Sequence, residues 1–352
     1  MIDKLTYKHK KINKYTQGKS ANLQVVSSSC NQTKMAELTN FTEDENQKTF
    51  EEQSCSSEFT EGVHGELIFL STINVLFSVA AFLGNTLILV ALHKESSLHP
   101  PSKLLYRNLA VTDLCVGIVV EPLKVASWIS MVNKKWKICY YVSLTNSLSA
   151  LLVCTVSLFT ITALSLDRLL ALLLGLRYRQ VVTLRSIYIT EVILWIFSII
   201  FTFINVWIPF VRLWVFRTVL PICLVTSVFS YTIILVTLRH KQNQVQEHIG
   251  QRQPSQAVAL NAARYRKAVY SALWVQVALV ACYLPFFITV VHVVRASQRG
   301  RRMSSSVLLA WQFTATLIYL NSSLNPLLYY WKIREVRQAV KETLEQLFRL
   351  SS

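Results

Sequence analysis

The stretch ICYYVSLTNSLSALLVCTVSLFTITALSL, residues 138–166, contains 29 residues without one charge and is followed directly by Asp167-Arg168. A helix needs about 20 apolar residues to cross roughly 30 Å of hydrocarbon. The stretch is apolar around its whole circumference, whereas a surface helix of a soluble protein keeps one polar face. It therefore predicts a transmembrane helix with the charged pair at its aqueous end.

Windows with few or no charges recur along the chain and predict seven spans in all. They are residues 67–92, 108–128, 138–166, 186–211, 218–238, 268–294 and 303–331. Open sheet edges cannot be satisfied in lipid, and long Leu, Ile, Val and Ala runs lack the alternation of barrel strands. We therefore expect an all-α membrane protein, a seven-transmembrane helix bundle.

The distribution of Lys and Arg indicates which ends of the spans face the cytoplasm. The segments on the C-terminal side of the membrane carry 18 of these residues, and the three loops on the other side carry nine. Cytoplasmic loops hold the basic excess, so we expect the C-terminus in the cytoplasm and the N-terminus outside the cell. The net charge of +17 is scattered over both faces, which argues against nucleic-acid binding.

The segment before the first span, residues 1–65, is polar and is expected to be a disordered extracellular tail. It carries glycosylation sequons at Asn31 and Asn40. No apolar stretch follows the basic start, so no cleavable signal peptide is visible. Residues 1–34 are lysine-rich and the tail turns acidic after Met35, which makes Met35 an alternative start to Met1.

The last segment, residues 332–352, has apolar residues at helical spacing. Ile333, Val336, Val340 and Leu344 recur every three or four residues, with Lys and Arg between them. This pattern predicts a short amphipathic cytoplasmic helix that binds the lipids of an anionic inner leaflet. The chain is thus expected to have a tail (1–65), a seven-transmembrane domain (66–331) and this membrane-surface helix.

The second span contains Asp113, and an ionised carboxylate inside a membrane is costly without partners or a cation. An alternative is a carboxyl group that burial keeps protonated, in a polar cluster without an ion. Candidate partners on other spans are Asn85, Ser157, Asn321, Ser322 and Asn325.

Two prolines interrupt the sixth and seventh spans. Pro326 removes one backbone hydrogen bond, and Asn325 and Tyr329 can satisfy the freed backbone. Pro285 has the same effect in the sixth span. One proline is equally consistent with a static kink and a hinge, but two flanking one polar cluster favour a switch.

Together these features resemble rhodopsin-like (class A) G-protein-coupled receptors over residues 67–347. The resemblance implies a multi-pass plasma-membrane receptor that is not an enzyme and that couples an extracellular ligand to a heterotrimeric G protein. The matching residues are Gly84-Asn85, Asn108–Asp113, Asp167-Arg168, Trp195, Cys282–Pro285 and Asn325–Tyr329.

The resemblance also implies roles for single residues. Asp113 and its polar neighbours would hold a hydrated Na+ ion, and Asp167 would hold Arg168 until activation releases it to meet the G protein. The coupling residues implied are Asp167, Arg168, Arg177, Tyr178 and Tyr329. The helix hinges and aromatic pivot implied are Pro285, Pro326 and Tyr283.

Three positions depart from the family pattern. Leu169 stands where the family usually has Tyr, Tyr265 stands near a common acidic position of the sixth span, and Tyr283 replaces the usual Trp. The sixth span then offers Arg168 no carboxylate. We expect a weak inactive-state clamp and measurable basal signalling.

Cys139 resembles the disulfide cysteine of the family, with two differences. It precedes Arg168 by 29 residues, about one helical turn more than usual, and the second outer loop, 207–217, has no cysteine. Such a loop is similar to that of melanocortin, cannabinoid, lysophospholipid and adenosine receptors. Cys139 then pairs with Cys30 or Cys55, or Cys30 pairs with Cys55.

The charges near the outer face narrow the ligand. No Asp or Glu lies between Cys139 and Asp167, so the third span lacks the counter-ion that an amine receptor needs, and no Lys in 303–331 could bind retinal. We therefore expect a ligand that is neither an amine nor retinal. The outer loops are basic and favour an anionic lipid, a small acid or a peptide, unless the acidic tail neutralises them. Glu121 and Lys124, one turn apart, either form an internal pair or line the pocket.

Two other functions compete with a signalling receptor. A decoy receptor that binds without coupling is consistent with Leu169, whereas a transporter would need inverted repeats or several intramembrane charges. No HExxH, GxSxG or phosphate-binding glycine loop occurs, so an enzyme is not expected.

Overall fold

The computed structural model describes residues 54–60, 62–94, 99–208, 210–249, 256–298 and 304–332, with 337, 338, 340–342 and 345 beyond them. This described part is helical and contains no strand. Cys30, Asn31, Met35 and Asn40 lie outside it, as does most of the helix expected over 332–352. The helices are α3 (Ser57–Thr60), α4 (His64–Lys94), α5 (Pro100–Cys115), α6 (Glu121–Val132), α7 (Trp136–Leu174), α8 (Tyr178–Val181), α9 (Leu184–Trp207), α10 (Phe210–Ile249), α11 (Gln256–Gln298) and α12 (Ser305–Lys332).

Six helices of the described chain are long and apolar enough to cross a membrane: α4, α7, α9, α10, α11 and α12. The expected second span is also present, but it is divided. A π-helical segment, η1 (Val116–Val120), joins α5 to α6 without an intervening turn. Neither part alone has the length of a span, and together they make the seventh member of the bundle.

The sequence explains why the second span changes its hydrogen-bond pattern at η1. The N–H of Glu121 bonds to the carbonyl of Val116, five residues back. Pro122 follows and has no N–H to continue the ladder. The carbonyl of Val120 accepts a hydrogen bond from Asn146 Nδ2 of α7 at 2.7 Å, so a side chain of the neighbouring helix satisfies the interrupted backbone.

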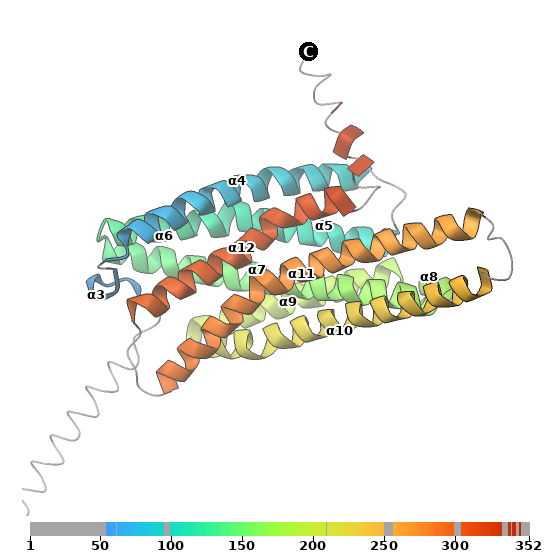
Figure 1. Ribbon diagram of the computed structural model, residues 1–352. Helices are drawn as coiled ribbons and strands as arrows, with labels where there is room; N and C mark the ends of the chain where they lie inside the picture. The colour runs from blue at the N-terminus through green and yellow to red at the C-terminus, as the bar shows by residue number, and fades with distance from the viewer. Residues whose placement is uncertain are drawn as a thin grey trace, which may run out of the picture. The chain divides into compact units, whose positions relative to one another are not determined.

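Helix α7 is the central element of the bundle (Figure 1). It packs against α5, α6, α9 and α10, while α4 packs against α5, α6 and α12, and α11 joins α10 to α12. Buried residues make up 56% of the apolar window of α7 but only 11% of that of α9. Helix α9 therefore lies at the periphery, with most of its side chains facing outward.

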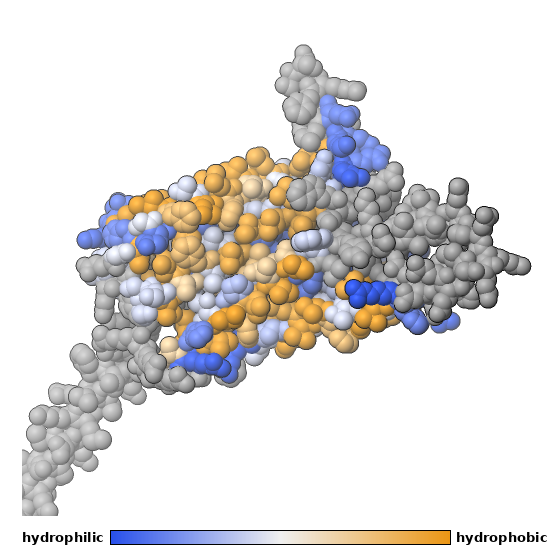
Figure 2. All heavy atoms as spheres, in the orientation of Figure 1, coloured by the Kyte–Doolittle hydropathy of each residue, from blue (hydrophilic) through white to orange (hydrophobic). Residues whose placement is uncertain are grey.

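The outward-facing side chains are those that lipid would contact. Large apolar residues are exposed along the helices, among them Leu76 of α4, Phe203 of α9 and Val225 of α10. Figure 2 shows apolar residues over most of the visible flank and hydrophilic residues concentrated toward the helix ends. A soluble protein rarely exposes so much contiguous apolar surface, so this flank fits a bilayer.

Helices α4 and α12 make close contact at Pro326. A Cβ added to Gly84 would lie 2.8 Å from Pro326 Cγ, so only glycine fits there without a shift. Pro326 has no N–H for the carbonyl of Ser322, four residues back, and Asn85 Nδ2 donates to that carbonyl at 3.1 Å. Asn85 of α4 therefore satisfies the freed carbonyl, whereas Asn325 Nδ2 donates to Asp113.

Several helices extend beyond their apolar windows. Helix α7 continues past Asp167-Arg168 to Leu174, so the charged pair does not mark its end. Helices α10 and α11 extend through most of the polar segment 239–266, to Ile249 and from Gln256. Lys, Gln, Glu and Ala are good helix formers, which allows the helices to continue where hydropathy falls.

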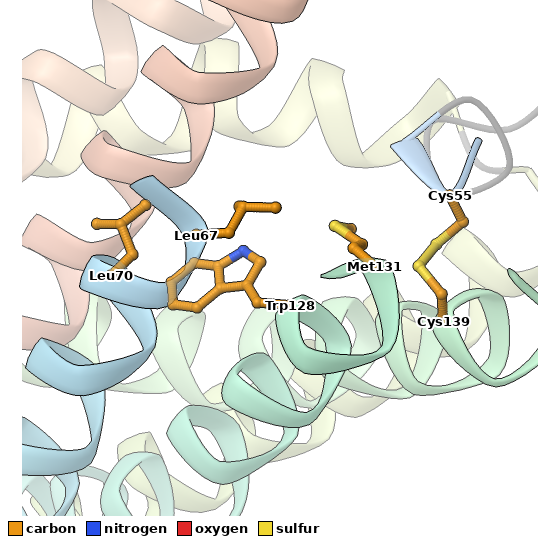
Figure 3. Packing of buried hydrophobic residues seen from close by; sticks show 6 residues of the cluster. All are labelled: Cys55, Leu67, Leu70, Trp128, Met131 and Cys139. Carbon is orange, nitrogen blue, oxygen red and sulfur yellow. A yellow bond between two sulfur atoms is a disulfide. The ribbon is translucent and has the colours of Figure 1, made fainter. Parts of the chain in front are cut away.

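Of the disulfide pairings left open by the sequence, the structure contains Cys55–Cys139. It ties the segment of α3 to the start of α7, and both cysteines are buried in a cluster with Leu67, Trp128 and Met131 (Figure 3). We call this the disulfide end of the bundle. The opposite end, where α5 begins and α7 ends, is the Arg168 end.

We expect Gly84→Ala to lower the thermal unfolding midpoint of the detergent-purified chain. Forcing a methyl group against Pro326 costs about 1–3 kcal/mol. Gly65→Ala on the same helix is the matched control, because no atom lies within 4 Å of its added Cβ. Equal midpoints for the two variants would contradict the close contact.

We expect Cys55→Ser and Cys139→Ser to destabilise the chain equally, and the double variant no more than either alone. Loss of one disulfide costs about 2–4 kcal/mol, or roughly 5–10 °C in the unfolding midpoint. Cys30→Ser should leave the midpoint unchanged. A fall with Cys30→Ser as large as with Cys55→Ser would contradict the pairing.

Candidate functional site

Asp113 lies completely buried on α5, between α4, α7 and α12. Asn325 Nδ2 of α12 donates a hydrogen bond of 2.7 Å to Oδ2 of Asp113. The Ser322 hydroxyl, from the same helix, also lies close to the carboxylate. The other oxygen, Oδ1, accepts no hydrogen bond from the described residues. The acid thus has partners from the seventh span and one oxygen left for a further donor or a cation.

The other residues expected around Asp113 are also buried, but none of them forms a hydrogen bond with its carboxylate in the described structure. Ser157 of α7 and Asn321 of α12 donate no hydrogen bond to the carboxylate within the described structure. Asn85 donates to the carbonyls of Ala81 and Ser322. Its contact with the cluster therefore runs through the backbone of α12.

One turn and a half before Asp113, Asn108 joins three helices. Its Nδ2 donates to Thr160 Oγ1 of α7 at 2.9 Å, and its Oδ1 accepts from Trp195 Nε1 of α9 at 2.9 Å. Both motif residues, Asn108 and Trp195, therefore hold α5, α7 and α9 together. Thr160 completes the contact and was not singled out from the sequence.

At the Arg168 end, two hydroxyl groups satisfy the buried carboxylate of Asp167. Ser102 Oγ of α5 donates to Oδ2 at 2.9 Å, and the Tyr178 hydroxyl of α8 donates to Oδ1. Burial, followed by this hydrogen bond, raises the pKa of Tyr178 to about 12, so the hydroxyl keeps its proton at neutral pH. Asp167 is therefore held by α5 and α8.

Arg168 is held more by Tyr106 than by Asp167. Its Nε lies 4.0 Å from Asp167 Oδ2, the outer limit of an ion pair, and its side chain is 39% exposed. Its Nη2 donates to the Tyr106 hydroxyl of α5 at 3.1 Å, and its guanidinium carbon lies 5.6 Å from the centroid of that ring. A partly exposed ion pair contributes only about 0–1 kcal/mol.

The remaining predicted residues differ in how well the structure describes them. Tyr283 is buried on α11, one turn from the ring contact between Phe286 and Trp311 of α12, whose centroids lie 4.9 Å apart. Leu169 packs beside the buried Tyr231 of α10. Arg177 is exposed in η2 (Gly175–Arg177). The side chains of Tyr265 and Tyr329 lie outside the described residues.

Ser102 and Tyr106 were missed by the sequence analysis, although both contact the charged pair. They lie four residues apart, which places them on one face of α5. That spacing was visible, but the partner of this face depends on how α5 is rotated against α7. The rotation of α5 against α7 is visible only in the structure.

Comparison with known proteins decides the family of this chain. The chain matches the model of the family described as 7 transmembrane receptor (rhodopsin family) over residues 84–212 and 206–329. The chain belongs to this family. As a rhodopsin-family receptor it is a multi-pass plasma-membrane protein, it is not an enzyme, and its family acts through heterotrimeric G proteins in response to extracellular ligands.

Curated relatives of this rhodopsin-family receptor include two histamine H2 receptors. That of Canis lupus familiaris is 25% identical over 301 residues, which cover 79% of this chain and 78% of the relative. That of Cavia porcellus is 25% identical over 300 residues, which cover 77% and 78%. These are amine receptors by name, whereas the sequence suggested likeness to a branch with other ligands.

We expect Tyr106→Phe to raise basal guanine-nucleotide exchange in membranes that contain the receptor and a G protein. The variant keeps the ring but removes the hydroxyl that binds Arg168, a loss of about 1 kcal/mol that releases the guanidinium roughly two- to fivefold more often. Tyr188→Phe is the control, since Tyr188 is exposed on α9. Unchanged exchange in Tyr106→Phe would refute this restraint.

Proposed function

We propose that this receptor passes ligand binding at the disulfide end to a heterotrimeric G protein at the Arg168 end. The observation that carries the proposal is the series of polar contacts along α5. Asp113 contacts α12, Asn108 contacts α7 and α9, and Tyr106 and Ser102 contact the charged pair of α7. A shift of α12 thus acts on the helix that restrains Arg168.

The moving elements in this proposal are α11 and α12. Each contains a proline, Pro285 and Pro326, which weakens the backbone ladder at one position. The ring contact of Phe286 with Trp311 couples the two helices on the disulfide side of these prolines. Ligand binding would shift the population toward a state in which Arg168 leaves Tyr106.

The proposed orientation follows from the basic residues. The disulfide end would face the cell exterior, where disulfides persist, and the C-terminus would lie in the cytoplasm. Asn31 and Asn40 would then carry glycans.

We also propose that Na+ binds beside Asp113 as an allosteric ion. The carboxylate has one oxygen without a hydrogen bond, and hydroxyl and amide oxygens of Ser157, Ser322 and Asn321 are of the type that hard cations prefer. When bound, the ion supplies a positive charge that neutralises the buried acid.

We also propose that the ligand carries an anionic group, as expected from the basic outer loops. Lys134, Lys135 and Lys137 are exposed beside the disulfide end and provide part of that field. An anion would be attracted to this face before it enters the bundle.

The decisive experiment measures guanine-nucleotide exchange by several classes of G protein in membranes that contain the full chain. We expect basal exchange above that of empty membranes, and its loss in Arg168→Ala. Arg177→Ala, on the exposed η2 turn, should reduce exchange less. Equal exchange in the wild type and Arg168→Ala, at equal surface expression, would favour a decoy receptor or a transporter.

A further inference from the structure

Glu121, the first residue of α6, is a completely buried acid that the proposed switch does not use. Neither carboxylate oxygen accepts a hydrogen bond from any residue that the structure describes. Asp113 and Asp167, by contrast, both accept hydrogen bonds from neighbouring helices. An isolated carboxylate in a membrane interior costs several kcal/mol, so Glu121 needs a cationic partner or a proton.

Lys124 does not satisfy the acid by hydrogen bonding. It lies one turn later on α6, and its ammonium group is placed 5.3 Å from the centroid of the Trp128 ring. An internal pair of Glu121 with Lys124, one of the two alternatives that the sequence left open, would have given the acid a hydrogen-bond donor. Both oxygens of Glu121 are without a donor among the described residues. An ionised Glu121 would therefore need a cation from elsewhere.

The local backbone fixes Glu121 toward the interior of the bundle. The π-helical bond to Val116 and the contact of Asn146 with Val120 hold the peptide units on its N-terminal side. Glu121 is completely buried on α6, which packs against α4 and against α7, the helix that carries Arg168. The acid thus faces the helices that carry the proposed switch.

Glu121 also lies nearer the disulfide end than Asp113 does. It follows Asp113 by eight residues, about 12 Å along a helix, on the side of the disulfide end. A ligand entering from that end would meet Glu121 before the Asp113 cluster.

We propose that Glu121 binds the ammonium group of the ligand of this receptor. The inference rests on the proposed receptor function and names the chemistry of its ligand. The expectation that the ligand is not an amine rested on the third span, which has no acid between Cys139 and Asp167. Glu121 supplies the carboxylate from the second span. A ligand with both an ammonium and a carboxylate group, such as a peptide, would also suit the basic outer loops.

The test uses the full chain in detergent with three probes, histamine, phenethylamine and glycyl-phenylalanine, each paired with its N-acetylated form. We expect at least one ammonium probe to raise the thermal unfolding midpoint while its N-acetylated form, which lacks the ammonium group, does not. Glu121→Gln should raise at least tenfold the probe concentration that is needed for half of this midpoint shift. Glu191→Gln, which neutralises another buried glutamate on α9, should keep it. If no ammonium probe distinguishes the wild type from Glu121→Gln, the proposal is wrong.

Infrared spectroscopy tests the competing role, a carboxyl group that simply holds a proton. A protonated carboxyl band that disappears in Glu121→Gln and does not change with any probe would overturn the proposal. A band that decreases when an ammonium probe binds would support it. Basal nucleotide exchange that depends on Arg168 would survive either result, so failure here is distinct from failure of the receptor function.

Discussion

The hydrogen bond from Asn325 to Asp113 joins the second span to the seventh at a depth where water cannot replace it. Its geometry depends on the adjacent Pro326, which interrupts the ladder of α12 and packs against Gly84. Asn85 then satisfies the carbonyl that the proline leaves free. Three helices are therefore fitted around one carboxylate, and none can move far without exposing a buried polar group to hydrocarbon.

Helix α5 transmits this constraint because its polar residues recur along its length. From the middle of the bundle to the Arg168 end, Asp113 contacts α12, Asn108 contacts α7 and α9, and Tyr106 and Ser102 contact α7. Each of these contacts has at least one uncharged side chain, whereas the ion pair of Arg168 with Asp167 lies within α7 and spans 4.0 Å. Such a series is stable as a whole but can be rearranged one contact at a time.

The spans and the buried acids could be predicted from the sequence, because charge is excluded from lipid and Asp113 stands out against that background. Helix ends could not, since α7 continues after the charged pair through a second apolar run, residues 169–174. The partners of Asp167 and the choice of Cys55 for Cys139 also could not. Both depend on the rotation and placement of helices, which pattern alone does not determine.

The π-helical segment η1 sets the phase of the second span. Each residue of an α-helix advances by about 100° around the axis, and a five-residue step includes one residue more than the regular four. If the same residues formed a regular α-helix instead, all of α6 would turn by about that angle relative to α5. Glu121 and Trp128 would then rotate away from the interior, so the wide turn of η1 is what brings both side chains inside the bundle.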